Sequence, residues 1–125
     1  MENIHIPALS DSPEVILDFN KNKFQFKGRS LPEDVDEFYK PIEEKLKQYL
    51  KTVSDHVELV FNFEYFNTAS SKKILDILTL FGDKFLTNKD ALTIKWNYRN
   101  DDEDMLDAGK DLQEITELDF HFELM

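Results

Sequence analysis

The chain contains three segments in which apolar and polar residues largely alternate, and a helix-like segment separates each from the next. Residues 57–63, 91–98 and 116–124 show a period of two, which is typical of strands with one buried face. Residues 69–86 and 102–114, which lie between them, carry apolar residues at helical spacing. Strand–helix–strand units of this kind indicate parallel pairing with right-handed crossovers.

The alternation also indicates where the helices lie. A parallel sheet that is covered on both faces reads as continuous apolar runs, whereas each of these strands has one polar face. We therefore expect the helices to cover mainly one face of the sheet. Right-handed crossovers that all lie on one side add the strands in sequence order.

An antiparallel hairpin is expected before the first of these units. Residues 14–19 and 23–27 read as two strands joined by a turn at residues 20–22. Gly28 is expected to end the second strand, and the sequence leaves open whether residues 4–7 add an edge strand.

A helix is expected to follow from Leu31, with Ser30 as its cap and acidic residues in its first turn. Its apolar stripe consists of Val35, Phe38, Tyr39, Ile42, Leu46, Tyr49 and Leu50. Pro41 interrupts this stripe and lacks a backbone donor, so we expect it to kink the helix or to start a second one.

The element order predicts an α/β fold, a (βα) superhelix with a mixed sheet of about five strands and helices mainly on one face. The 125 residues fit one compact domain. We therefore expect residues 1–125 to form a single domain.

Composition excludes several classes of function. The absence of cysteine excludes disulfides, thiol catalysis and cysteine-based zinc sites. The net charge of −11 and the lack of a basic patch argue against binding to nucleic acid or to anionic membrane surfaces. No apolar run is long enough to span a bilayer and no secretory signal is present, so we expect a cytoplasmic protein without membrane association.

Motifs for metals, cofactors and catalysis are missing. The three histidines lie in separate elements, without the spacing of a metal site. Three glycines form no nucleotide-binding loop, so we expect no metal and no cofactor. A small acidic enzyme with clustered carboxylates is a weaker alternative, which would require a pocket holding carboxyl groups with raised pKa values.

The chemical feature that stands out is a group of polar residues where the strand at 57–63 passes into the following helix. Asn67, Thr68, Ser70, Ser71 and Lys72 lie at this junction. Free backbone N–H groups and the positive end of the helix dipole favour an anion there. Either Asn67 or Thr68 could simply cap the helix.

A second hypothesis is that Thr68 is a phosphorylation switch. A phosphate adds roughly −1.5 to −2 charge, which the helix start can accommodate and which Lys72, one turn on, can pair with. A partner that accepts a neutral hydroxyl would meet a dianion that is costly to desolvate. Ser70 or Ser71 could be the acceptor instead.

The residues resemble known families of regulatory proteins. The element order and the hydroxyl at the junction resemble STAS-domain anti-anti-sigma factors of the SpoIIAA type. The closer resemblance is to the SiaC family of regulatory phosphoproteins, and it covers nearly the whole chain. The residues that carry it are Ile4-His5-Ile6-Pro7-Ala8, Ser12-Pro13-Glu14-Val15, Phe19, Gly28-Arg29-Ser30-Leu31-Pro32-Glu33, Phe38-Tyr39-x-Pro41, Leu46-x-x-Tyr49 and Phe61-x-Phe63-x-Tyr65-Phe66-Asn67-Thr68-x-Ser70-Ser71-Lys72.

This resemblance implies a partner-switching protein without catalysis of its own. A cognate serine/threonine kinase would phosphorylate Thr68 and a PP2C-type phosphatase would reverse it. The unphosphorylated form would bind and activate a diguanylate cyclase and so raise cyclic-di-GMP. An anti-sigma kinase as partner, or a constitutive interaction domain, would fit the same fold.

The expected docking surface is the helix start. Thr68 is the residue that the resemblance assigns, while Asn67, Ser70, Ser71 and Lys72 are its neighbours and candidate contacts. The segment from Gly28 to Glu33, with Arg29 and Ser30, is a second candidate surface.

Overall fold

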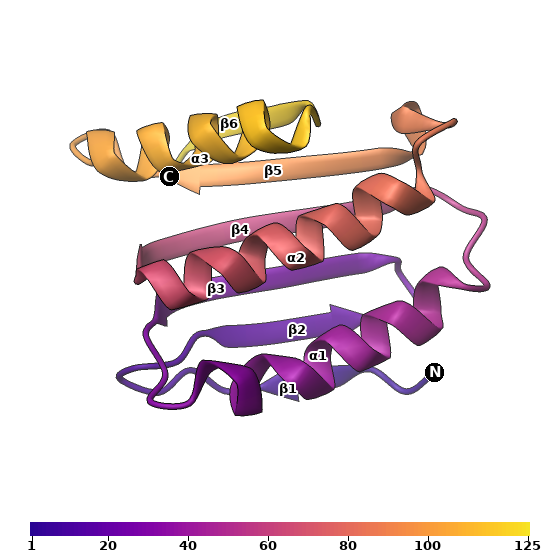
Figure 1. Ribbon diagram of the computed structural model, residues 1–125, viewed down its shortest axis with the longest axis horizontal. Helices are drawn as coiled ribbons and strands as arrows, with labels where there is room; N and C mark the ends of the chain where they lie inside the picture. The colour runs from indigo at the N-terminus through magenta and orange to yellow at the C-terminus, as the bar shows by residue number, and fades with distance from the viewer.

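The computed structural model describes residues 1–125 and forms two layers, a sheet and a set of helices on one of its faces (Figure 1). In chain order the elements are β1 (Ile4–Ile6), β2 (Glu14–Asp18), β3 (Lys23–Ser30), α1 (Val35–Leu50), β4 (Val57–Phe66), α2 (Thr68–Lys84), the short 3₁₀ helix η1 (Lys89–Ala91), β5 (Leu92–Tyr98), α3 (Glu103–Thr116) and β6 (Phe120–Leu124).

The six strands form one sheet in sequence order, from β1 to β6. The pairs β1–β2 and β2–β3 are antiparallel, and the pairs β3–β4, β4–β5 and β5–β6 are parallel. The predicted superhelix, with its N-terminal hairpin and helices on one face, is therefore confirmed. The expected number of strands was one too low, because Ile4 and Ile6 pair with Leu17 and Val15 of β2.

The core lies between the helices and the sheet. It is a single cluster of 26 buried residues, and it is rich in aromatic rings. Phe61 stacks on Phe26 with ring centroids 5.5 Å apart, and Trp96 stacks on Phe120 at 6.0 Å. The alternating strands thus direct their apolar side chains toward the helices, as the sequence pattern predicts.

The other face of the sheet is open and polar. Glu58 of β4 accepts from Lys95 at 3.0 Å and lies 3.9 Å from Lys23 on the opposite side. This face has no helix over it, which agrees with the polar half of the alternating pattern.

Three local predictions need correction. Ser30 does not cap α1; Asp34 does, and its carboxylate accepts from the backbone N–H of Glu37 at 3.0 Å. Gly28 does not end β3, which continues to Ser30 after a register shift that the positive φ of Gly28 (112°) permits. Pro41 lies within one continuous α1 and starts no second helix.

The packing of α3 on Trp96 gives a stability prediction. A Cβ atom at Gly109 would lie 2.5 Å from the buried Trp96 ring, which is held by a hydrogen bond from Nε1 to the Met105 carbonyl at 2.9 Å. We expect Gly109→Ala to lower the free energy of unfolding by about 1–3 kcal/mol through overpacking, measured by urea denaturation.

Gly82→Ala is the matched control. It also lies in a helix, but its Cβ would meet only the end of the Leu118 side chain, at 3.3 Å. Alanine has a better helix propensity than glycine, by about 1 kcal/mol, and this gain should offset the contact with Leu118. Equal destabilisation by the two substitutions would contradict the close packing at Gly109.

Candidate functional site

Thr68 is the first residue of α2, and its side chain is exposed. The residue before it, Asn67, is the cap: its backbone is extended, and its side-chain oxygen accepts from the N–H of Ser70 at 2.8 Å. The Asn67 carbonyl accepts from the N–H of Ser71 at 2.9 Å. Between the two possible caps, the structure thus selects Asn67, and no intramolecular hydrogen bond engages the Thr68 hydroxyl.

The surroundings of Thr68 suit an added negative charge. The N–H groups of Thr68 and Ala69 lie in the first turn, where a helix has no internal acceptors. The first turn of α2 contains no acidic residue, whereas those of α1 and α3 contain two each. Lys72 is exposed one turn further and forms no salt bridge, while Lys73 is paired with Asp36 at 2.7 Å.

The Lys73–Asp36 pair joins α2 to α1 next to this site. Hydrogen bonding from Lys73 lowers the pKa of the Asp36 carboxyl group. Because Lys73 is engaged in this pair, Lys72 is the nearby lysine with a free ammonium group on the same helix.

A cluster of three buried hydroxyl groups lies beneath the start of α2. Ser30, Tyr39 and Ser70 are each 0% exposed. Ser30 Oγ lies 2.5 Å from the Tyr39 hydroxyl and donates to Ser70 Oγ at 2.9 Å. The cluster joins the end of β3, the first half of α1 and the first turn of α2, so the three elements meet at this point.

Parallel pairing of β3 with β4 brings the end of β3 next to the end of β4, which leads into α2. Arg29 is in register with Tyr65 and Ser30 with Phe66, and the N–H of Asn67 donates to the Ser30 carbonyl at 3.1 Å. The Arg29 guanidinium lies 5.5 Å from the centre of the Tyr65 ring, a cation–π contact. Tyr65 is 46% exposed, so an aromatic ring with a cation beside it lies at the end of β4, two residues before the cap of α2.

The structure separates the predicted site residues into two groups. Thr68, Lys72 and Arg29 are exposed, and Asn67 and Ser71 are half-buried. Ser30 and Ser70 were expected to contact a partner, but they are buried, because their hydroxyls bond to one another below the surface. In the folded chain they therefore position the site and do not form part of its surface.

The three candidate acceptor hydroxyls differ in the same way. Thr68 is exposed with a free hydroxyl, Ser71 Oγ donates to the Thr68 carbonyl at 2.7 Å, and Ser70 is buried. Geometry therefore favours Thr68 over the two serines. The sequence analysis named Tyr39 as a core residue, and Tyr39 and Tyr65 among the residues of the resemblance, but it predicted neither as a site residue. For Tyr65 the available signal was an aromatic residue two positions before the cap.

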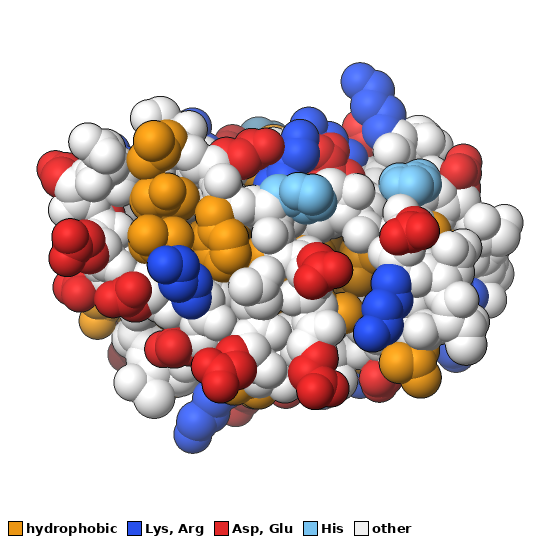
Figure 2. Space-filling view, turned by 90° about the horizontal axis from the view of Figure 1, so that it is seen from above, with side chains coloured by type: hydrophobic (Ala, Val, Ile, Leu, Met, Phe, Trp, Pro, Cys, Tyr) orange, Lys and Arg blue, Asp and Glu red, His pale blue; other side chains and the backbone are white.

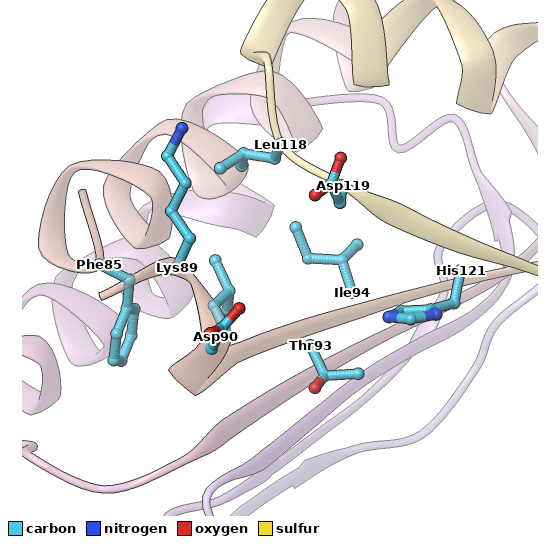
Figure 3. Close-up of a pocket in the computed structure, with 9 residues that line it drawn as sticks. Phe85, Lys89, Asp90, Thr93, Ile94, Leu118, Asp119 and His121 are labelled. Atoms are coloured by element: carbon cyan, nitrogen blue, oxygen red, sulfur yellow. The ribbon is translucent and has the colours of Figure 1, made fainter. Parts of the chain in front are cut away.

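A cavity of about 280 Å³ lies at the other end of the sheet, between η1 and the starts of β5 and β6 (Figure 3). Asp90 of η1, Asp119 just before β6 and His121 of β6 are among the residues that line it. Glu43, the carboxyl group whose pKa burial raises, lies on α1 and does not line this cavity. The hypothesis of an enzyme with clustered carboxylates requires one pocket that holds carboxyl groups with raised pKa values. This cavity does not hold Glu43 and so does not meet that requirement.

No helix in the structure has the length and apolar composition needed to cross a membrane.

Comparison with known proteins now identifies the family. The model of the SiaC family of regulatory phosphoproteins matches residues 6–125. The chain belongs to the SiaC family. A protein of Pseudomonas aeruginosa (strain UCBPP-PA14), itself described as uncharacterized, is 23% identical over 120 residues, which is 96% of this chain and 94% of that protein.

Solved SiaC structures share the fold. SiaC of Pseudomonas aeruginosa in the crystal structure of the diguanylate cyclase SiaD with its activator SiaC gives a TM-score of 0.91 and 22% identity, over 98% of this chain and 99% of that one. The structure of apo-SiaC from the same organism gives 0.86 and 23%, over 100% and 99%.

The assignment of Asn67 as the cap and of Thr68 as an exposed residue without a side-chain partner gives a prediction for this SiaC family member. Asn67→Ala should lower the free energy of unfolding by about 1 kcal/mol, since it removes the cap. Thr68→Ala should change it by less than about 0.5 kcal/mol, because the exposed hydroxyl has no partner. Urea denaturation of both variants measures this, and a larger effect at Thr68 than at Asn67 would contradict the assignment of the cap.

The hydroxyl cluster gives a pH prediction. Burial raises the pKa of Tyr39 to about 12, although its hydrogen bonds with Ser30 and Ser70 oppose the shift. An unfolded tyrosine loses its proton near pH 10, so the unfolded state gains stability between about pH 10 and about pH 12. The free energy of unfolding should fall over this range, by about 2 kcal/mol from this group.

Tyr39→Phe should remove this part of the pH dependence, measured by urea denaturation from pH 9 to 12. Tyr65→Phe, the same substitution at an exposed tyrosine, is the control, and Tyr39→Phe should flatten the pH dependence more than it does. The prediction fails if the two variants have the same slope.

Proposed function

We propose that this protein is a partner-switching regulator whose docking surface is the start of α2 and whose switch is phosphorylation of Thr68. The observation that carries the proposal is that Thr68 is exposed at the first turn while Asn67 performs the capping. The hydroxyl is thus available for chemistry without a cost to the helix. Membership of a family of regulatory phosphoproteins supports the same role.

In the unphosphorylated state the start of α2, with the exposed Thr68 and Lys72, binds the output partner, and the Arg29–Tyr65 pair at the ends of β3 and β4 is a second contact. Tyr65 supplies an exposed ring and the two basic residues supply donors, a combination that is common at binding hot spots. A diguanylate cyclase is the proposed output partner, because the SiaC of Pseudomonas aeruginosa is the activator of the cyclase SiaD. This protein would then act in cyclic-di-GMP signalling without catalysing a reaction itself.

Phosphorylation ends docking through charge and size. A phosphate of roughly −1.5 to −2 charge at Thr68 would face the free N–H groups of the first turn and the Lys72 ammonium group. The fold accommodates it there, but a partner that had accepted a neutral hydroxyl would have to desolvate a dianion. A serine/threonine kinase and a PP2C-type phosphatase are the proposed opposing enzymes.

The site is tested by phosphorylating the purified protein with its cognate kinase and ATP and mapping the phosphate by intact and peptide mass spectrometry. We expect a single phosphate on Thr68 in the wild type and none in Thr68→Ala. Quantitative phosphorylation of Thr68→Ala at one site would show that the acceptor lies elsewhere.

The switch is tested by binding of the output partner to variants. Thr68→Ala should bind as the unphosphorylated wild type does and keep binding when kinase and ATP are added. Thr68→Asp should bind at least about tenfold more weakly, about 1.4 kcal/mol, yet less weakly than the phosphoprotein, because one charge replaces nearly two.

Thr79→Asp is the matched control, since Thr79 is an exposed threonine later in the same helix. It adds the same charge away from the helix start and should leave the affinity unchanged. Equal losses at the two positions would mean that net charge, and not the start of α2, governs binding.

A further inference from the structure

β6 forms one edge of the sheet and leaves backbone groups without partners. The N–H of Met125 donates to the Tyr98 carbonyl of β5 at 2.9 Å, so the backbone of Met125 faces inward. Backbone groups alternate in direction along a strand, and those of Phe120, Phe122 and Leu124 therefore face outward. The N–H of Phe120 is taken by the Gln113 side chain at 2.8 Å, whereas Phe122 and Leu124 have no strand beside them.

Apolar side chains gather at the same edge. Figure 2 looks onto this side of the molecule and shows a group of hydrophobic side chains toward its left, the side on which the chain ends in Figure 1. Leu124 is 60% exposed and Met125 53%, and Phe122 is half-buried. An exposed apolar edge strand is a template for pairing with another strand.

The side chains of β6 are complementary to those of a second, antiparallel β6. If two copies pair about a twofold axis at Phe122, then Phe122 faces Phe122 and Phe120 faces Leu124. His121 of each copy then faces Glu123 of the other, twice per dimer. These are non-hydrogen-bonded positions, where opposed side chains approach most closely.

Neighbouring registers lack this complementarity. An axis at His121 would set His121 against itself and Asp119 against Glu123, and an axis at Glu123 would set two carboxylates against each other. With the axis at Phe122, the N–H and carbonyl groups of the two Phe122 residues form two hydrogen bonds with each other. The Leu124 N–H of each copy also donates to the Phe120 carbonyl of the other.

We propose that the β6 edge of the sheet is a homodimer interface, in which β6 pairs antiparallel with β6 of a second copy about a twofold axis at Phe122. The sheet becomes continuous across the two copies, and the cross-strand pairs of His121 with Glu123 fix the register. The start of α2 remains free, because it follows β4, which lies two strands in from this edge. The dimer is thus independent of the proposed switch.

Sedimentation equilibrium of the full chain at about 0.15 M salt, where surface charges are screened beyond about 8 Å, tests the interface. The average mass should rise with concentration from 14.8 kDa toward twice that value. Leu124→Pro removes an outward N–H while keeping the inward bond of Met125, so it should weaken dimerisation by about tenfold or more. A constant mass of 14.8 kDa up to about 1 mM wild-type protein would overturn the proposal.

Two charge variants test the register, with circular dichroism to confirm that each is folded. His121→Glu sets carboxylates against each other in its own dimer, and Glu123→Lys removes both cross-strand pairs of His121 with Glu123. Each variant should therefore dimerise more weakly than the wild type. A mixed dimer of the two variants contains one wild-type pair, His121 with Glu123. Its other pair sets the new carboxylate at position 121 against the new ammonium group at position 123. Native mass spectrometry with one variant ¹⁵N-labelled should find mixed dimers in more than the half expected from random pairing.

Glu44→Lys, an exposed substitution on α1 with the same charge change as Glu123→Lys, is the control. It should dimerise as the wild type does and show no preference for His121→Glu. Random pairing in the mixture of His121→Glu and Glu123→Lys, or pairing with Glu44→Lys equal to it, would overturn the proposed register. A mass that rises equally in Leu124→Pro and the wild type would place the interface elsewhere.

Discussion

The start of α2 is held in place by hydrogen bonds in which the Thr68 hydroxyl takes no part. The Asn67 side chain caps the helix, and the buried hydroxyls of Ser30, Tyr39 and Ser70 fasten its first turn to β3 and α1. Unsatisfied polar groups at this depth would each cost about 1–3 kcal/mol, so the cluster fixes one arrangement of three elements. The exposed hydroxyl can therefore be modified while the structure around it stays the same.

Under the proposed function, this separation would let a small acidic protein carry a switch without a conformational change. The chain has a net charge of −11, yet the first turn of α2 has no carboxylate, and the exposed Lys72 lies one turn further along the helix. A phosphate at Thr68 meets donors within its own chain. A partner that approached the same surface would meet the phosphate, so in the proposed switch one chemical group has opposite consequences for folding and for docking.

Much of the fold could be predicted from the sequence because the alternation in β4, β5 and β6 indicates both strand pairing and the side on which the helices lie. β1 could not, since Ile4–Ile6 is too short to show a period and depends on pairing with β2. Thr68 could be located as a helix-start hydroxyl, and the resemblance to the SiaC family indicated its role. The burial of Ser30 could not be predicted: a serine near a helix reads as a cap, and only the β3–β4 register brings it beneath Asn67. The contact of Arg29 with Tyr65 depends on the same register.

The most direct measurement is calorimetric titration of the proposed partner, a diguanylate cyclase, with this protein in two forms, unphosphorylated and carrying one phosphate on Thr68. Amide NMR spectra of both forms accompany the titration. The unphosphorylated form should bind, and the phosphorylated form should bind at least about a hundredfold more weakly, about 2.7 kcal/mol, with spectral changes confined to the start of α2 and its neighbours. Equal affinity of the two forms would contradict a switch at Thr68. Loss of binding together with spectral changes throughout the core would contradict the claim that the fold is unchanged.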